Sequence, residues 1–342
     1  MIRPFEIGDL FLVQRLHRQA TKLDIVQALL EPRSTTWAAL HTLRPWNDKR
    51  QTTYVLRQTG HTLARAGLLQ AEGGNGQGEA HIVQIAPALD TPRGHPAVWD
   101  KLLAHYLHDA AQQGVLRIFA DVPDQPLPVT TLAHAGFHVY QRMTIWRLIA
   151  QDAGEFVEPV QWTSRPQSRE DEWPLLRLYS RITPKAVQSA EGAMEPPGTA
   201  RSAPPILGGW YDGEIRGYVL LDKGDLLGCV QVAFGQLGSW MRLWVDCDRP
   251  DSACVRQLVR QGLVATRRSN PRQPLYVGVA EHQGGLASVL TDFGFAPFTD
   301  RACLVRQLVQ RVVEPELQRV ILRERMPEPV VSFRDLGETQ AN

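Results

Sequence analysis

A basic turn that contains a glycine, placed directly before a predicted helix, is the part of this sequence most suited to chemistry. In the stretch TPRGHPAVWDKLL, residues 91–103, Arg93 and Gly94 precede a run of apolar side chains with helical spacing. Backbone N–H groups at a helix N-terminus and the helix dipole together attract phosphate oxygens. The turn therefore predicts a phosphate site. The alternative is an ordinary helix start, because Pro96 is typical of a first helical turn and offers no N–H donor.

Histidine and cysteine side chains do not form a recognisable metal-binding pattern. His105 and His108 are three residues apart on a predicted helix, but no carboxylate at metal-ligand spacing accompanies them. The four cysteines include no CxxC pair, so no zinc site is predicted. We expect surface or packing roles for most histidines, and reduced thiols in a cytoplasmic protein for the cysteines. A cluster of histidines in the first half comprises His81, His95, His105, His108, His134 and His138.

The length and composition of the chain favour a soluble protein with two domains. Its 342 residues exceed one typical domain, and 43% of them are hydrophobic while 21% are charged. The net charge of +1 gives no basic surplus for nucleic acid. No apolar run approaches the roughly 18 residues of a membrane span, and the N-terminus lacks a signal-peptide pattern. We therefore expect no nucleic-acid partner, no membrane association and a cytoplasmic location.

Periodicity predicts alternating helices and strands in the first half. Residues 8–18 form a predicted helix with Asp9 as its N-cap, and the runs TTYVLRQ and TLARAGLLQ form a hairpin with its turn at Thr59–Gly60. The glycine-rich stretch 73–78 lies between two strands, which predicts a loop rather than a nucleotide site. The remaining elements are a buried strand AHIVQIAP, a helix over 97–113, a strand VLRIFADV, a short helix closed by Gly136 and a long final strand FHVYQRMTIWRLI.

The second half repeats this order of elements. It contains a helix EDEWPLLRLYSRI, a hairpin with an Asp212–Gly213 turn, two strands, a helix over 251–267, a further strand, a helix closed by Gly294 and a final strand DRACLVRQLV. A near-constant spacing predicts two duplicated domains, although α/β proteins also repeat such patterns by chance. The spacing is 158 positions for Gly136 and Gly294, 159 for Ile118 and Val277, and 156 for Leu102 and Leu258.

Three stretches, together with the order of elements, resemble the GNAT acetyltransferase family. IRPFEIGDL is similar to the family's opening segment, and LAHAGFHVYQRMTIWRL and LTDFGFAPFTDRACLVRQL are similar to its closing segment with a Gly-Phe pair. The likeness covers most of the chain as two tandem copies, and it implies an α/β fold with an α+β mixed sheet. The implied parts are an N-terminal domain (1–150), a degenerate C-terminal domain (160–312), a loop or linker (189–205) and a C-terminal extension (313–342).

The resemblance implies an acetyl-CoA site in the first half. In this family the cofactor lies in a gap beside the strand that matches HIVQIAP, with the pyrophosphate on the turn before the next helix. Pro96 and the bulky Trp99 depart from the family's turn. His81 is the candidate for the general base, and His134 is a second one. The cofactor-binding residues implied by the resemblance are Ile85, Ala86, Arg93, Gly94, His95, Ala97 and Val98, with backbone N–H groups near Ile85 on the thioester carbonyl.

The second half departs further from the family pattern. No glycine occurs between Val245 and Val259, and three aspartates in the turn between them would repel a pyrophosphate. The second copy is therefore predicted to be a scaffold. The tyrosine that many family members use as general acid is replaced by Leu132 and Leu290, which cannot donate a proton.

Two hypotheses follow from the resemblance. The first is an N-acetyltransferase that moves an acetyl group from acetyl-CoA to a small-molecule or peptide amine, with the C-terminal copy structural. The second is a catalytically inactive GNAT-fold module for binding or assembly, with a protein partner. The fold alone does not decide between them.

Overall fold

The computed structural model describes most of the chain up to residue 308. Residues 1–310 form one compact unit, and residues 311–342 form a second unit that lies outside the described residues. The predicted extension 313–342, most of the predicted linker 189–205 and the turn at Thr59–Gly60 also lie outside them. The described residues are 1–31, 39, 51–58, 65–73, 78–149, 162–192, 205–207, 210–246 and 252–308.

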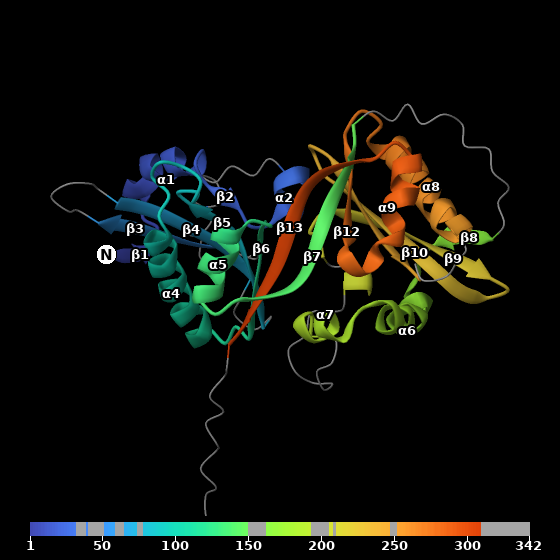
Figure 1. The fold of residues 1–342 in the computed structure, drawn as a ribbon, viewed down its shortest axis with the longest axis horizontal. Coiled ribbons are helices and arrows are strands. Elements are labelled where there is room, and N and C mark those ends of the chain that lie inside the picture. The colour runs from blue at the N-terminus through green and yellow to red at the C-terminus, as the bar shows by residue number, and fades with distance from the viewer. Residues whose placement is uncertain are drawn as a thin grey trace, which may run out of the picture. The chain divides into compact units, whose positions relative to one another are not determined.

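The order of elements agrees with the sequence analysis in both halves (Figure 1). The first half contains β1 (Ile2–Pro4), α1 (Leu10–His17), β2 (Thr21–Lys22), α2 (Ile25–Leu30), β3 (Thr52–Gln58), β4 (Arg65–Gly73), β5 (Glu79–Ala86), α4 (Pro96–Gln112), β6 (Arg117–Pro123), α5 (Pro126–His134) and β7 (His138–Leu148). The second half contains β8 (Thr163–Pro166), α6 (Glu172–Ile182), α7 (Lys185–Ala190), β9 (Glu214–Asp222), β10 (Asp225–Phe234), β11 (Ser239–Val245), α8 (Ser252–Ser269), β12 (Leu275–Ala280), α9 (Gly285–Asp292) and β13 (Ala296–Gln307).

Several details differ from the predictions. The short strands β1, β2 and β8 and the helices α2 and α7 were not predicted. The hairpin turn of the second half lies at Lys223–Gly224, not at Asp212–Gly213, because β9 begins only at Glu214. Lys223 and Gly224 have φ angles of 48° and 96°, and a two-residue type I′ turn requires positive φ at both positions.

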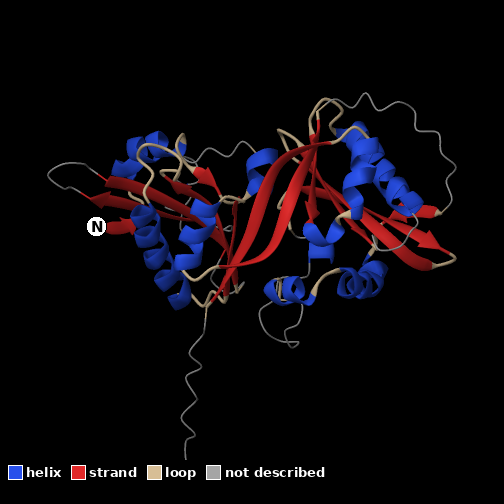
Figure 2. Ribbon diagram, in the orientation of Figure 1, coloured by secondary structure: helices blue, strands red, loops and turns tan. Residues whose placement is uncertain are grey.

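The two halves exchange their last strands within one mixed sheet. The strand order along the sheet is β1-β3-β4-β5-β6-β13-β7-β12-β11-β10-β9-β8, with β2 beside β5. The last strand of the second half, β13, pairs antiparallel with β6 of the first half, and β7 pairs antiparallel with β12. Figure 2 shows the long strands β7 and β13 side by side where the two halves meet. Each half therefore needs a strand of the other to complete its sheet, and the halves form one compact unit. The predicted boundaries 1–150 and 160–312 stay a prediction.

Each half has its own apolar core beneath its long helix. The apolar positions of α4 that predicted this helix face the core of the first half, where Trp99, Leu102 and Leu103 are fully buried. In the second half α8 places Leu258, Val259 and Leu263 in a separate core. The helices that end before Gly136 and Gly294 do so as predicted, because both glycines have a φ above 80°. These cores hold the strands between which a ligand site can form.

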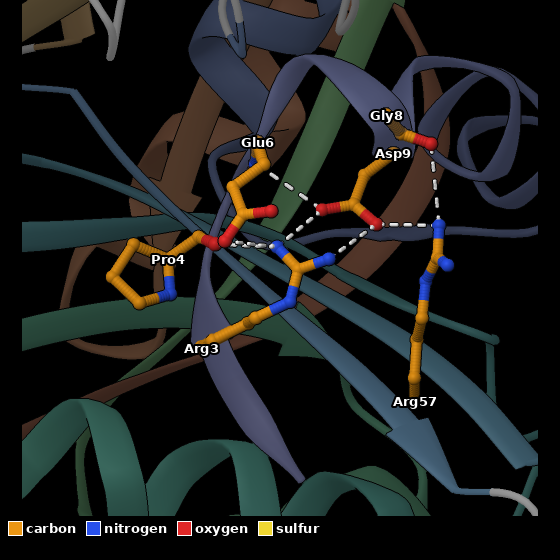
Figure 3. A network of polar contacts seen from close by, with 6 residues as sticks. All are labelled: Arg3, Pro4, Glu6, Gly8, Asp9 and Arg57. Carbon is orange, nitrogen blue, oxygen red and sulfur yellow. Dashed lines mark hydrogen bonds and ion pairs between the residues drawn. The ribbon is translucent and has the colours of Figure 1, made fainter.

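A buried aspartate joins the first strand to the first helix (Figure 3). Asp9 is 0% exposed, and its carboxylate oxygens lie 2.8 Å from Arg3 and 2.6 Å from Arg57. It also accepts a hydrogen bond of 3.2 Å from the backbone N–H of Glu6. Buried charges require such partners, because the cost of removing them from water is large. The contact therefore fixes the entry into α1.

The second half repeats this contact at a spacing of 162 positions. Arg165 binds both carboxylate oxygens of Asp171 at 2.8 and 2.7 Å, and the backbone N–H of Ser168 donates to the same carboxylate at 2.7 Å. The stretch SRPQSRED is thus the counterpart of IRPFEIGD. This further sign of duplication was present in the sequence and was missed.

We predict that Asp9→Asn and Asp171→Asn each lower the free energy of unfolding by about 1.5–3 kcal/mol, because each removes charge-assisted hydrogen bonds from a buried group. Asp100→Asn, at an exposed position of α4, serves as the control and should change it by less than about 0.5 kcal/mol. Denaturant unfolding monitored by circular dichroism measures all three. Equal effects of the buried and exposed substitutions would contradict this account.

The effect of Asp171→Asn should also depend on pH. The hydrogen bonds from Arg165, and then those from Ser168, hold the pKa of Asp171 below its usual value. Because the pKa is lower in the folded chain, the stabilisation is present above the unfolded pKa of about 4 and is lost as the pH falls through the folded pKa. The stability difference between the wild type and the variant should therefore shrink on acidification.

Candidate functional site

Three backbone N–H groups of the predicted phosphate turn donate to acceptors within the turn itself. Gly94 donates to the carbonyl oxygen of Thr91 at 2.8 Å. Ala97 donates to Nδ1 of the His95 side chain at 3.1 Å, and Val98 donates to the carbonyl oxygen of His95 at 2.9 Å. These donors do not converge on one point where a phosphate could bind. The turn has the hydrogen bonds of an ordinary capped helix start.

Packing explains why residue 94 is a glycine. A Cβ atom there would lie 2.2 Å from the carbonyl oxygen of Ala88, so only glycine fits against the preceding loop. Arg93 is exposed. Trp99 is fully buried, and its indole N–H donates to the carbonyl oxygen of Pro87 at 2.9 Å. Trp99 therefore belongs to the core of the first half rather than to a ligand cleft.

The gap beside β5 is occupied by the protein's own chain. Strand β5 pairs in parallel with β6 only over Glu79–His81, and the two strands then diverge. Beyond that point β2 pairs with β5, with Thr21 opposite Ile85. The N–H of Leu23 donates to the carbonyl oxygen of Val83 at 2.8 Å. The edge of β5 that the resemblance assigns to the cofactor is thus hydrogen-bonded to residues 21–23.

The inserted segment is held on its other side as well. The N–H of Asp121 in β6 donates to the carbonyl oxygen of Leu23 at 2.9 Å, and the Asp121 carboxylate accepts from the N–H of Ile25 at 2.9 Å. Arg301 of β13 is 4% exposed and donates to the carbonyl oxygens of Lys22 and Asp121, at 2.8 Å each. A side chain from the second half therefore fastens the segment that fills the gap of the first half.

The structure does not gather the predicted cofactor residues around an open slot. Ile85 and Ala86 are fully buried beneath these contacts. The assignment of acetyl-CoA to these residues and to Arg93, Gly94, His95, Ala97 and Val98 stays a prediction. Strand β2 could not be predicted from the sequence, because a two-residue strand has no periodicity of its own.

Among the described residues, no strand fills the corresponding gap of the second half. Strands β11 and β12 pair in parallel only over Ser239–Met241 and Leu275–Val277, the same three-residue register as in the first half. By this register Leu243 corresponds to Val83. Its carbonyl oxygen accepts a hydrogen bond of 3.4 Å from the side-chain amide of Gln283, not from a strand. The divergence opens into a cavity that Leu243, Gly278 and Ala280 line.

This central cavity, of about 210 Å³, is built from both halves. The first half contributes the inserted segment and residues of β5, β6 and β7, and the second half contributes β11, β12, β13 and the helices α6 and α7. Aromatic and acidic side chains predominate among its functional groups. The aromatic ones are Phe119, Tyr140, Tyr179, Trp210, Trp240 and Trp244, and the charged ones include Asp24, Asp121, Glu191 and Arg242.

Burial changes the proton affinities of the acidic groups in the cavity. Burial raises the pKa of Glu191, whose carboxylate accepts a hydrogen bond from the Tyr179 hydroxyl. Burial also raises the pKa of Asp24, and the nearby charge of Asp121 adds to this effect. A carboxylate with a raised pKa is a better proton acceptor at neutral pH. The cavity therefore contains two candidate general bases.

Trp244 and Arg242 are two further residues of the cavity lining. The buried indole Nε1–H of Trp244 has no hydrogen-bond acceptor among the described residues. An unsatisfied buried donor costs about 1–3 kcal/mol, which a ligand carbonyl at this position would offset. The Arg242 guanidinium lies 4.0 Å from the ring centroid of Trp210, which orients both side chains.

The histidine candidates lie in different places. His81 lines the central cavity and stacks on Phe119, with 5.2 Å between ring centroids. His134 is exposed at the end of α5 and is not among the residues that line the cavity. Leu132 and Leu290 are fully buried apolar side chains. Within the described part of the chain, no three metal-ligating side chains are grouped.

Comparison with known proteins supports the fold. No family model matches the sequence, and no curated protein matches it. A solved tandem GNAT protein from the clavulanic acid biosynthesis pathway, without acetyl-CoA, is 17% identical with a TM-score of 0.51, and the match covers 90% of this chain and 98% of that one. This chain has the tandem GNAT fold.

A second solved structure agrees with this assignment. A GCN5-related N-acetyltransferase from Sphaerobacter thermophilus is 10% identical with a TM-score of 0.52, and the match covers 90% of this chain and 95% of that one. The GNAT fold places the divergent strand pairs β5/β6 and β11/β12 at equivalent positions of its two copies. In the described residues, no helix is both long and apolar enough to cross a membrane.

We predict that Gly94→Ala destabilises the protein by about 1–3 kcal/mol, because its Cβ would overlap the carbonyl oxygen of Ala88. Gly8→Ala is the matched control, since a Cβ there meets nothing within 4 Å, and it should change stability by less than about 0.5 kcal/mol. Thermal and denaturant unfolding distinguish the two. If Gly94→Ala were neutral for stability, a ligand-binding role for this glycine would regain support.

Proposed function

We propose that this protein is an acyl-CoA-dependent N-acyltransferase whose working site is the central cavity. One contrast carries the proposal. Strands β11 and β12 diverge and leave a cavity between them, whereas the gap between β5 and β6 is filled by the segment that contains β2. The acyl-thioester arm would enter the second half, and the acceptor amine would bind between the halves. This reverses the roles that the sequence predicted for the two copies.

The donor side offers groups that suit an amide-bearing arm. The carbonyl oxygen of Leu243 accepts from the Gln283 side-chain amide, and an amide N–H of the arm would take the place of that donor. The free indole N–H of Trp244 would donate to a carbonyl of the arm or of the acyl group. Asp246, one of the aspartates expected to repel a pyrophosphate, lies 3.6 Å from Arg181, which partly balances its charge.

The acceptor side suits an amine. Aromatic faces and carboxylates both attract a cationic amine, and a proton acceptor must convert the ammonium into the neutral nucleophile. Glu191 is the strongest candidate for that role, because burial raises its pKa and Tyr179 orients its carboxylate. The neutral amine would attack the thioester carbonyl, forming the C–N bond as the C–S bond breaks. CoA would leave as the thiolate and take up the proton that the amide nitrogen loses, giving free CoA thiol. Proximity of the two reactants would supply much of the rate.

Titration calorimetry with acetyl-CoA tests the proposal. We expect saturable binding by the wild type and about tenfold weaker binding by Trp244→Phe, since the loss of one hydrogen bond costs about 1–1.5 kcal/mol. Gly278→Leu, which adds a side chain inside the β11/β12 divergence, should abolish binding. Arg93→Glu in the first half is the control and should bind like the wild type.

The outcomes separate the alternatives. Binding that Arg93→Glu abolishes, and that Trp244→Phe leaves unchanged, would return the site to the first half. No binding by the wild type at millimolar acetyl-CoA would contradict the transferase proposal and favour an inactive binding or assembly module. Circular dichroism of each variant guards against loss of fold, and Glu191→Gln then tests turnover with an amine panel in the same preparations.

A further inference from the structure

A second cavity lies in the first half, outside the proposed transfer site. Its volume is about 250 Å³, below the roughly 300–1,000 Å³ of pockets for drug-sized ligands, so it suits a small metabolite. It is lined by residues of α2 and by the strands β2, β3, β4 and β5. Among the described residues, the linings of the two cavities share only Asp24.

A row of polar side chains crosses the wall of this cavity. Thr53, Gln70, Gln84 and Lys22 are register partners on four neighbouring strands. The Gln70 amide donates to the Thr53 hydroxyl at 3.1 Å, and the Gln84 amide donates to Gln70 at 2.5 Å. The Lys22 ammonium donates to the Gln84 side-chain oxygen. Three of the four are less than 6% exposed, so the sheet carries a buried polar row where an apolar one would pack more simply.

Charges of opposite sign lie at different places in the cavity. Lys22 lies beside His17, with Nζ 3.2 Å from Nδ1. Burial lowers the pKa of Lys22 to about 8, so the ammonium is still mostly charged at pH 7. Burial, and then the charge of Lys22, lowers the pKa of His17, which is therefore neutral. Glu72 lies two residues beyond Gln70 along β4, and its carboxylate accepts from the side-chain amides of Gln27 and Gln51, at 3.1 and 2.7 Å.

We propose that this cavity binds a small zwitterion of amino-acid size, with its carboxylate at Lys22 and its ammonium group at Glu72. A ligand with both charges matches a cavity that holds a cation on β2 and an anion on β4, the two strands that pair with β5. An ion of one sign would meet its like charge there. Glu31 supplies a second carboxylate to the lining. The amide row between the charges offers both donors and acceptors to the rest of the molecule. The inference does not depend on the proposed transferase activity.

Helix α2 connects this cavity to the second half. Its residues Gln27 and Ala28 line the cavity together with its N-cap Asp24 and its C-cap Glu31, at the helical spacing of one face. The other face packs on the second half, where the carbonyl oxygen of Leu30 accepts from the N–H of Leu237 at 3.0 Å. Glu31 also accepts a hydrogen bond of 2.5 Å from the Tyr211 hydroxyl. Ligand binding should therefore stabilise the whole compact unit and not only its first half.

The test uses the complete protein and the free L-amino acids as probes, each at millimolar concentration. Thermal shift identifies the probes that raise the unfolding temperature, and calorimetry measures their affinity. We expect at least one amino acid to bind. Lys22→Met and Glu72→Gln should each weaken its binding at least tenfold, while Lys101→Met, at an exposed position of α4, should leave it unchanged.

Controls address the class of ligand and the fold of the variants. Ethylamine and acetate each carry one of the two charges and should bind far more weakly than the amino acid. Glu72→Gln keeps the shape of the side chain, so it tests the proposal even if Lys22→Met does not fold. The proposal is overturned if no amino acid binds, if ethylamine or acetate binds as well as the amino acid, or if binding survives both substitutions.

Discussion

Two parallel strands that diverge inside a protein leave backbone N–H and C=O groups on their inner edges, and these groups must find partners. This protein meets the requirement twice and in two ways. At Val83 the partner is the backbone of the segment that contains Leu23, and at Leu243 it is the side chain of Gln283. A backbone segment fills a gap completely, whereas one side chain leaves a cavity beside it. The first copy is therefore filled and the second copy contains a cavity, because their partners at these two positions differ.

Because the two halves exchange β7 and β13, the residues that surround each gap come from both halves. Arg301 belongs to β13 by sequence, yet it lies beside β6 and donates to the segment that fills the gap of the first half. In the same way, Met143 of β7 pairs with Ala280 of β12 and lines the central cavity. Neither copy would present the same site alone, because each site includes a strand that the other copy supplies.

Local signals in the sequence predicted the elements, and non-local contacts decided the site. The spacing of Trp99, Leu102 and Leu103 predicted a helix with a buried face, and Gly136 marked a helix end because its φ is positive. The sequence could not show which strand would lie beside β6, since periodicity does not encode a pairing partner. It also could not show why residue 94 is a glycine. A glycine can leave room for a phosphate, but at Gly94 the space beside the backbone is occupied by the carbonyl oxygen of Ala88.

The segment that fills the gap of the first half also lines the cavity at the gap of the second half. Residues Leu23, Asp24, Ile25 and Val26 follow directly from β2, and all four line the central cavity. The contacts that fill the gap of the first half therefore also place a wall, and a carboxylate with a raised pKa, at the gap of the second half. Removing the segment would open the first gap and at the same time take away part of the second site. A tandem GNAT fold with one closed copy is thus consistent with a single working site that needs both copies.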